Sequence, residues 1–452
     1  MKRSTLWGSG RPTNTTLFAF TTDDREWDAA LLRWDLLGSL GHVEGLAAAR
    51  LLSVRDAARL RGALRVLLRE AAAGRFAAAE DDEDIHSAIE RALTARLGAA
   101  GARIHAGRSR NDQVAVAVRL WLKDALLGLH EAGSRLADAL LGFARRHRAA
   151  LWPGYTHTRA AMPSSAGQWA HAHICGLLDT MEGLPALWAR LDRCPLGSGA
   201  GFGVPLALDP AVAARSLGFA GTEPSLAAVQ FGRGKLEADA LWFAVQLGHD
   251  LGRLCADVVL YGGEEFDLLA LPAGWTTGSS IMPQKRNPDL FELARARAGE
   301  VEGELATVLR LKANLTSGYH RDFQRLKAPL LRGLGTMRGA LAAVAAALPE
   351  LLPRPGAAAR VSGGILAADA ALALAERGVP FRTAYRRIAK ELADRTFRAE
   401  IAPKRLFERR RVAGGLGNLG LDKAAARLRQ TRRWATREAR RFSAATVRLA
   451  GG

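Results

Sequence analysis

The sequence predicts an all-α protein with a central bundle of long helices. Alanine, leucine and arginine dominate the composition and favour helices, whereas aromatic residues make up only 6%. Five long segments place apolar residues at steps of three and four, and few stretches alternate in the manner of strands. The apolar fraction is 48% over 452 residues, which indicates a globular chain large enough for two or three domains.

The five helical segments follow one another along the middle of the chain. The first starts at Gln113, and the others cover 164–191, 235–261, a run from Pro288, and 328–348. The hundred residues before them are predicted as short helices, and Leu-Pro-Arg-Pro-Gly at 352–356 is predicted as a linker. We therefore expect three helical domains, at 1–107, at 108–352 for the central bundle, and at 353–452 for a smaller C-terminal domain.

The formal net charge of +19 has two interpretations. Arginines gathered into one arm or tail would indicate nucleic-acid binding, but here they are scattered, which favours solvated helix faces. The densest basic tract runs from Arg427 to Arg441 and predicts a basic face whose field attracts anions. Nucleic acid is therefore not an expected partner.

Cysteine usage and hydropathy predict a cytoplasmic protein. Cys175, Cys194 and Cys255 are an odd and sparse set, which argues against a disulfide framework and for a reducing compartment. None has a metal-type spacing, and His171 and His173 would not share a helix face, so we predict no metal site. The N-terminus lacks an apolar signal core and no apolar stretch is long enough to cross a bilayer, so no membrane partner is expected.

The most informative stretch is the run Gly-Ser-Ser-Ile-Met-Pro-Gln-Lys-Arg-Asn-Pro at 278–288. It is predicted to lead into a helix, with Asn287 as the cap, Pro288 at the first helical position and Asp289 complementing the positive helix end. Ser279 and Lys285 would then lie on a flexible segment beside that terminus. Such a place suits carboxylate binding and oxyanion stabilisation, and the alternative is a helix entry without chemistry.

Two polar segments precede the first and second long helices. In 105–113, Arg110 and Asn111 would present guanidinium and amide donors suited to a carboxylate, and the alternative is an N-cap with solvent-facing arginines. In 153–159, His157 follows Thr156 in an irregular stretch between prolines. A histidine there favours proton transfer over the alternative of a core histidine.

Two further positions complete the candidate site. Glu292 lies one helical turn beyond the capping region and could orient and charge an imidazole, although a surface glutamate is the alternative. In 318–327, Tyr319, Gln324 and Lys327 could direct polar tips into a site, whereas a polar helix junction is the competing interpretation.

The run at 278–288 resembles the signature of the fumarase/aspartase superfamily. Together with 107–113, 154–157 and 284–289, it resembles the argininosuccinate lyase branch of that superfamily, and the similarity extends from Leu6-Trp7-Gly8 to 378–382. The resemblance implies a fumarase/aspartase-like homotetramer with a core of about twenty long helices, five from each subunit. It also implies that three subunits share each active site, which lets distant segments converge.

The resemblance further implies elimination of fumarate from argininosuccinate without a metal or organic cofactor. Ser279 would be the base, and His157 paired with Glu292 would be the acid or proton relay. Lys285 and Asn287 would hold the carboxylate that gains charge. The remaining substrate groups would be bound by six residues: Arg110, Asn111, Thr156, Tyr319, Gln324 and Lys327.

This sequence departs from the family pattern near the amine end of the expected substrate. Ala106, Arg159 and Phe231 stand where other residue types are common in the family, and Asp24 lies near the place of a substrate-contacting serine. Two alternatives therefore accompany the prediction. One is a paralogous lyase acting on another N-succinyl compound, and the other is a non-catalytic basic structural or nucleic-acid-binding protein, which only the +19 charge supports.

Overall fold

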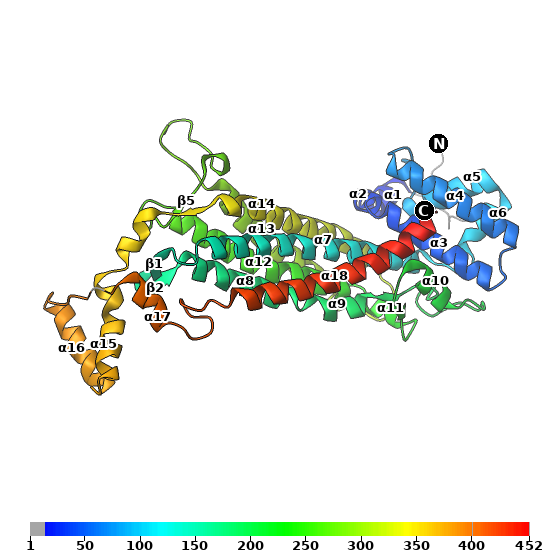
Figure 1. Ribbon diagram of the computed structural model, residues 1–452. Coiled ribbons are helices and arrows are strands. Elements are labelled where there is room, and N and C mark those ends of the chain that lie inside the picture. The colour runs from blue at the N-terminus through cyan, green and yellow to red at the C-terminus, as the bar shows by residue number, and fades with distance from the viewer. Residues whose placement is uncertain (1–13, 400, 452) are drawn as a thin grey trace.

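The computed structural model describes residues 14–399 and 401–451, and Leu6, Trp7 and Gly8 lie outside this part. Five long helices pack side by side as an elongated bundle (Figure 1). They are α7 (Arg110–Arg146), α8 (Ala166–Met181), α12 (Lys235–Tyr261), α13 (Asp289–Lys312) and α14 (Lys327–Ala347). The all-α prediction is therefore confirmed, and each long helix begins within about three residues of its predicted start.

One continuous apolar core runs through the bundle. Leu126, Leu129 and Leu136 of α7 are fully buried, as are Leu247 and Leu251 of α12. Their spacing of three, four or seven residues puts them on one face of each helix. Burial of a leucine side chain contributes roughly 1.5–3 kcal/mol, so this stripe holds the helices in register.

The N-terminal helices form a compact group at one end of the bundle (Figure 1). They are α1 (Thr15–Thr21), α2 (Arg25–Ala29), α3 (Leu32–Ala48), α4 (Val54–Ala72), α5 (Ile85–Leu97) and α6 (Ala99–Ala102). Asp84 starts α5 because its side chain accepts a hydrogen bond from the Ser87 N–H. Helix α3 packs against α4, α5 and α7, and α2 packs against α5 and α14.

The segment around His157 is a β-hairpin, so the prediction of an irregular stretch was wrong. Strands β1 (Leu151–Thr156) and β2 (Arg159–Ser165) pair antiparallel, and the last pair joins Thr156 to Arg159. His157 and Thr158 form the two-residue turn with φ angles of 53° and 56°. Such turns usually carry Asn-Gly, and the missing Gly left the hairpin without its usual sequence signal.

The other strands are short. They are β3 (Arg193–Cys194) with β4 (Gly221–Thr222), in parallel, and β5 (Leu269–Ala270) with β6 (Leu352–Pro353), antiparallel. The helical run expected at 164–191 is broken, since α8 ends at Met181 and α9 (Leu184–Leu191) follows with Pro185 in its first turn. Helices α10 (Pro210–Leu217) and α11 (Ala228–Phe231) complete the middle of the chain.

The helices that follow the linker at 352–356 extend from one end of the bundle to the other. Helices α15 (Ala367–Glu376), α16 (Phe381–Ala393) and α17 (Pro403–Arg409) lie at the far end of the bundle. Helix α18 (Leu421–Ala450) then returns along α7 and α8 and reaches α3 and α10 (Figure 1). Within residues 14–399 and 401–451, no helix is both long and apolar enough to cross a membrane.

Candidate active site

The loop at 278–286 is tied at its base and projects from the end of the bundle near β5 (Figure 1). The Thr277 N–H donates to the Asn287 carbonyl at 3.1 Å, and the Asn287 N–H donates to the Thr277 carbonyl at 2.8 Å. Ser279 Oγ accepts hydrogen bonds from the N–H groups of Ile281 at 3.4 Å and Met282 at 3.2 Å. Two backbone donors at one hydroxyl oxygen favour negative charge on that oxygen.

The entry into α13 differs from the prediction by one position. Pro288 occupies the N-cap position, and no side chain caps the helix, so Asn287 is not the cap. Asn287 Nδ2 instead donates to the Gly278 carbonyl at 3.3 Å and reinforces the base of the loop. Asp289 accepts a hydrogen bond from Thr277 Oγ1, and Asp289 and Glu292 supply the acidic first turn.

The hairpin presents His157 to solvent. Thr156, His157 and Arg159 are all exposed, and Thr158 Oγ1 donates to the His157 carbonyl at 2.6 Å. The His157 imidazole has no hydrogen-bond or ion-pair partner among the described residues, so it is not a core histidine. Glu292 is exposed on α13, and no contact between it and His157 occurs within the described part of the single chain.

Arg110 and Asn111 begin α7 at the opposite end of the bundle. Ser109 and Asp112 form a capping box that fixes this helix start. Arg110 is not free, since its guanidinium lies 2.7 Å from Glu83 Oε1 and 2.8 Å from Asp84 Oδ2. Burial alone would lower the pKa of Arg110, but the two carboxylates outweigh it and raise this pKa.

Lys327 is buried at the start of α14 and is held by the carboxylates of Asp24, the N-cap residue of α2, and Asp28 within α2. Its Nζ lies 2.5 Å from Asp24 Oδ2 and also bonds to Asp28 Oδ1. Burial alone would lower the pKa of Lys327, but Asp28 and Asp24 outweigh it and raise this pKa. Asp28 is a residue that the sequence reasoning missed, although its position four residues after Asp24 puts both on one helix face.

Tyr319 and Gln324 lie near Lys327. Gly318, at a φ of 93°, turns the chain into the segment that carries them, and a 3-10 helix, η3 (Arg321–Leu326), follows. The Tyr319 ring packs edge-on against Phe323 with the ring centroids 5.8 Å apart. Tyr319 and Gln324 are half-buried, and the Gln324 amide has no hydrogen-bond partner in the described part of the chain.

A glycine-rich loop beside Asn111 also escaped the sequence reasoning. Gly197, Gly199, Gly201 and Gly203 all have positive φ angles, and this alternation of glycines was the available signal. The Gly199 N–H donates to Asp112 Oδ2 at 3.0 Å, and the Ala200 carbonyl accepts from Asn111 Nδ2 at 3.4 Å. Burial raises the pKa of Asp112 to about 6, against the opposing effect of its hydrogen bonds.

The positions that depart from the family pattern are spread around the same end, apart from Arg159. Ala106 is exposed, and its carbonyl accepts a hydrogen bond from His42 Nε2 at 3.0 Å. Phe231 is half exposed and lines a cavity of about 360 Å³ together with Gln230 and Arg233. Gln230 is buried, and both polar atoms of its amide have no partner among the described residues.

The candidate residues therefore form two groups at opposite ends of the molecule. Helix α7 has 37 residues and spans about 55 Å between the group at Arg110 and the hairpin that follows it. Helix α13 has 24 residues and separates the loop of Ser279 from the segment of Tyr319 by about 36 Å. One chain does not bring the two groups together.

Known proteins match this chain over most of its length. The family model described as "Lyase" matches residues 16–303. Argininosuccinate lyase from Sorangium cellulosum (strain So ce56) is 45% identical over 94% of this chain and 98% of that relative. The enzyme of the same name from Xanthomonas oryzae pv. oryzae (strain PXO99A) is 39% identical over 90% of this chain and 94% of that relative.

Solved structures show the same fold at low sequence identity. A crystal structure of EDDS lyase in complex with formate has a TM-score of 0.80 at 22% identity, covering all of this chain and 96% of that one. Class II fumarase from Schistosoma mansoni has a TM-score of 0.66 at 15% identity, covering 84% of this chain and 89% of that one. The overall fold is thus shared with these proteins. At 39–45% identity to curated relatives over at least 90% of its length, the chain belongs to the argininosuccinate lyase family.

Proposed function

We propose that this protein cleaves argininosuccinate into arginine and fumarate. The observation that carries the proposal is the loop at 278–288, which presents Ser279 and Lys285 in a chain 45% identical to an argininosuccinate lyase. The loop is exposed and tied only at its base, so a substrate can reach the Ser279 hydroxyl.

Ser279 removes the proton in this mechanism. The proton leaves the succinyl carbon next to a carboxylate, and its electron pair moves into that carboxylate as an enolate-like dianion. The N–H groups of Ile281 and Met282 favour the charged form of the serine oxygen before the transfer. The C–N bond then breaks, its electron pair leaves with the nitrogen, and the nitrogen takes up a proton as fumarate and arginine separate.

The remaining roles follow from charge and position. Lys285 and Asn287 stabilise the carboxylate that gains charge, and His157 with Glu292 supplies the proton relay. Thr156, Arg110, Asn111, Tyr319, Gln324 and Lys327 bind the other substrate groups. Arg110 and Lys327 already hold carboxylate partners in this chain, so those partners set the orientation of both cations toward a substrate.

The active site is assembled from several subunits of a homotetramer. The two groups of candidate residues lie at opposite ends of α7 and α13, so antiparallel copies would bring unlike ends together. Exposed apolar side chains on the bundle helices support such contacts: Trp242 is 52% exposed, Leu293 61% and Leu309 46%.

Fumarate release from argininosuccinate, followed by ultraviolet absorbance, tests this function. Ser279→Ala should lower kcat by roughly a hundredfold to ten-thousandfold, as expected when a general base is removed. Ser280→Ala is the matched control, because Ser280 is an exposed serine of the same loop, and it should retain most of the activity. Full activity of Ser279→Ala, or no turnover by the folded wild-type oligomer, would refute the assignment.

Arg159 favours one second candidate, a lyase for a different N-succinyl compound. Its exposed guanidinium group lies two residues from His157, where it would repel a cationic substrate end. A panel of N-succinyl amino compounds separates the two functions. Preference for an anionic or neutral amine part over argininosuccinate, reversed by Arg159→Gln, would establish the second.

A further inference from the structure

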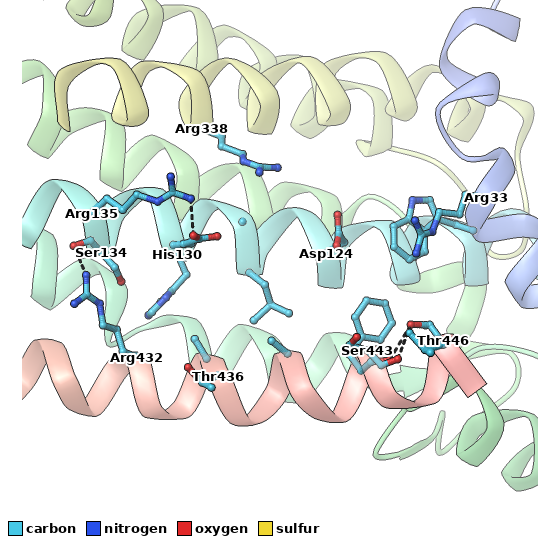
Figure 2. A pocket seen from close by; sticks show the side chains of 18 residues that line it. Arg33, Asp124, His130, Ser134, Arg135, Arg338, Arg432, Thr436, Ser443 and Thr446 are labelled. Atoms are coloured by element: carbon cyan, nitrogen blue, oxygen red, sulfur yellow. Dashed lines mark hydrogen bonds and ion pairs between the residues drawn. The ribbon is translucent and has the colours of Figure 1, made fainter. Parts of the chain in front are cut away.

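A groove between α7 and α18 forms a cavity of about 720 Å³ away from all the candidate catalytic residues (Figure 2). Helix α3 closes one end of the groove, and α14 contributes Arg338 from above in the view of Figure 2. The groove lies along the middle of α7, between the two groups of residues described above. It is therefore separate from both parts of the candidate active site.

Arginines dominate the charge of this groove. Four arginines and two carboxylates line it, which leaves a net charge of +2. Arg135 pairs with Glu131 at 2.5 Å. Arg432 donates to the Ser134 carbonyl at 2.9 Å and also pairs with Asp138, which lies outside the groove lining. Arg338 forms no ion pair or hydrogen bond with any residue that the structure describes, and in Figure 2 its guanidinium extends over the groove.

Two buried polar groups also face the groove without partners. His130 and Ser134 line the cavity and are 2% and 3% exposed, and neither His130 Nε2 nor Ser134 Oγ has a hydrogen-bond partner in the described part of the chain. Burial lowers the pKa of His130 to about 4, so its ring is neutral near neutral pH. Unsatisfied buried polar atoms are costly, and a bound ligand would satisfy them.

The rest of the groove is apolar or adds to its positive field. Leu127, Phe442 and Val447 line the groove, and Phe442 stacks on Trp34 of α3 at its end. On the outer face of α18, a second hollow of about 560 Å³ is lined by arginines at 429, 432, 433, 437 and 440. This outer face raises the local concentration of anions around the groove.

We propose that the groove binds a small phosphorylated molecule. Its phosphate lies against Arg338 and Arg432, hydrogen bonds reach His130 and Ser134, and its apolar part packs toward Leu127. A phosphate is favoured because it offers three acceptor oxygens and more than one charge to converging guanidinium groups. A small ligand is favoured over a nucleic-acid strand because the cavity lies between helices and not on the open face of α18.

Isothermal titration of the full-length oligomer at low salt tests this site, with pyrophosphate and adenosine monophosphate as probes and adenosine as the uncharged comparison. Arg338→Ala should raise the dissociation constant of both phosphate probes roughly tenfold, which is the effect of losing one charge-assisted contact. Gly128→Leu keeps every charge but fills the groove, since a Cβ at Gly128 would lie 3.0 Å from Arg338 Nη1. It should abolish binding, and leucine suits a helix better than glycine, so folding is preserved.

Two control variants remove one exposed arginine each. Arg386→Ala, on α16 and far from the groove, should bind both probes as the wild type does, and so should Arg433→Ala, on the outer face of α18. If Arg338→Ala, Arg386→Ala and Arg433→Ala all weakened phosphate binding equally, the binding would depend only on the overall positive charge of the protein. If Arg433→Ala lost phosphate binding while Gly128→Leu kept it, the anion would bind on the outer face of α18. Either result, or no binding of either phosphate probe, overturns the proposal.

Discussion

Lys327 and Lys123 are buried cations whose counter-ions come from distant parts of the chain. Lys123 Nζ lies 2.6 Å from Asp192 Oδ1 and 4.8 Å from the ring centroids of Phe219 and Phe442. The apolar period predicted the helices that carry both lysines. It could not predict their burial, because Asp192 is 69 residues from Lys123 and Asp28 is 299 residues from Lys327. The sequence therefore identified Lys327 as a candidate but not the ion pairs that fix it.

Replacement of Lys327 by methionine should destabilise the protein strongly. The change leaves Asp24 and Asp28 buried without their cation, which costs about 3–5 kcal/mol in the free energy of unfolding. Arg325→Ala is the control, since its 2.6 Å pair with Asp23 is about half exposed and contributes less than about 1 kcal/mol. Urea unfolding measures both changes, and equal losses would contradict the assigned burial.

His86 should make stability depend on pH. It lies 2.8 Å from Asp35, and although burial alone would lower the pKa of His86, Asp35 outweighs it and raises this pKa above 6.5. The contribution of the pair is thus fully present below pH 6.5 and is lost as pH rises through the raised pKa. The difference in urea midpoint between wild type and His86→Gln should shrink across that range. A difference that grows with pH would show the opposite shift.

The apolar period predicts the bounds of some helices, whereas the hairpin at His157 depends on the residues of its turn. Helix α12 begins and ends at Lys235 and Tyr261, as the stripe of leucines predicted. The hairpin at His157 was missed because its turn lacks the usual Asn-Gly pair, and the β-branched Thr158 is poorly suited to its positive φ angle. The hydrogen bond from Thr158 Oγ1 to the His157 carbonyl and the strand ladder hold this turn in place.

Relief of the strained turn should stabilise the hairpin. Thr158 is β-branched and has a φ of 56°, so Thr158→Gly should raise the free energy of unfolding by about 1 kcal/mol. Thr158→Ala keeps the Cβ that causes the clash, so its free energy of unfolding should rise by less. Urea unfolding of the three proteins gives the comparison, and a loss of stability in Thr158→Gly would mean that the hydroxyl contact outweighs the strain.

Within one chain, the residues that the proposed reaction requires in one site lie at opposite ends of the bundle. The order of helices and the existence of the bundle were predictable from the apolar period alone. The return of α18 along α7 was not, because its basic, amphipathic sequence does not indicate which surface it covers. The candidate residues were predicted from separate polar segments and their roles from a resemblance, whereas their placement at two ends of the bundle emerges only from the folded chain.

Hybrid oligomers should recover activity that neither parent has. Ser279→Ala removes a residue at one end of the bundle and Asn111→Ala removes one at the other, so each variant alone should be inactive or nearly so. Co-expression should restore activity several-fold above either parent, because some assembled sites receive both intact ends. A chain that carries both substitutions is the control and should not recover. Native mass spectrometry shows whether hybrids form. Hybrids that form but stay inactive would contradict a site shared between subunits.

The tie between Thr277 and Asn287 limits how far each part of the signature loop can travel. Ser279 is two residues from Thr277, so its Cα stays within about 7 Å of the tie, whereas Met282, at the middle of the loop, can lie up to roughly 17 Å away. The tip can thus swing over a bound molecule like a lid while the serine stays near the hinge. Closure and proton transfer are then coupled, because the N–H groups of Ile281 and Met282 that hold the Ser279 oxygen lie on the part of the loop that moves.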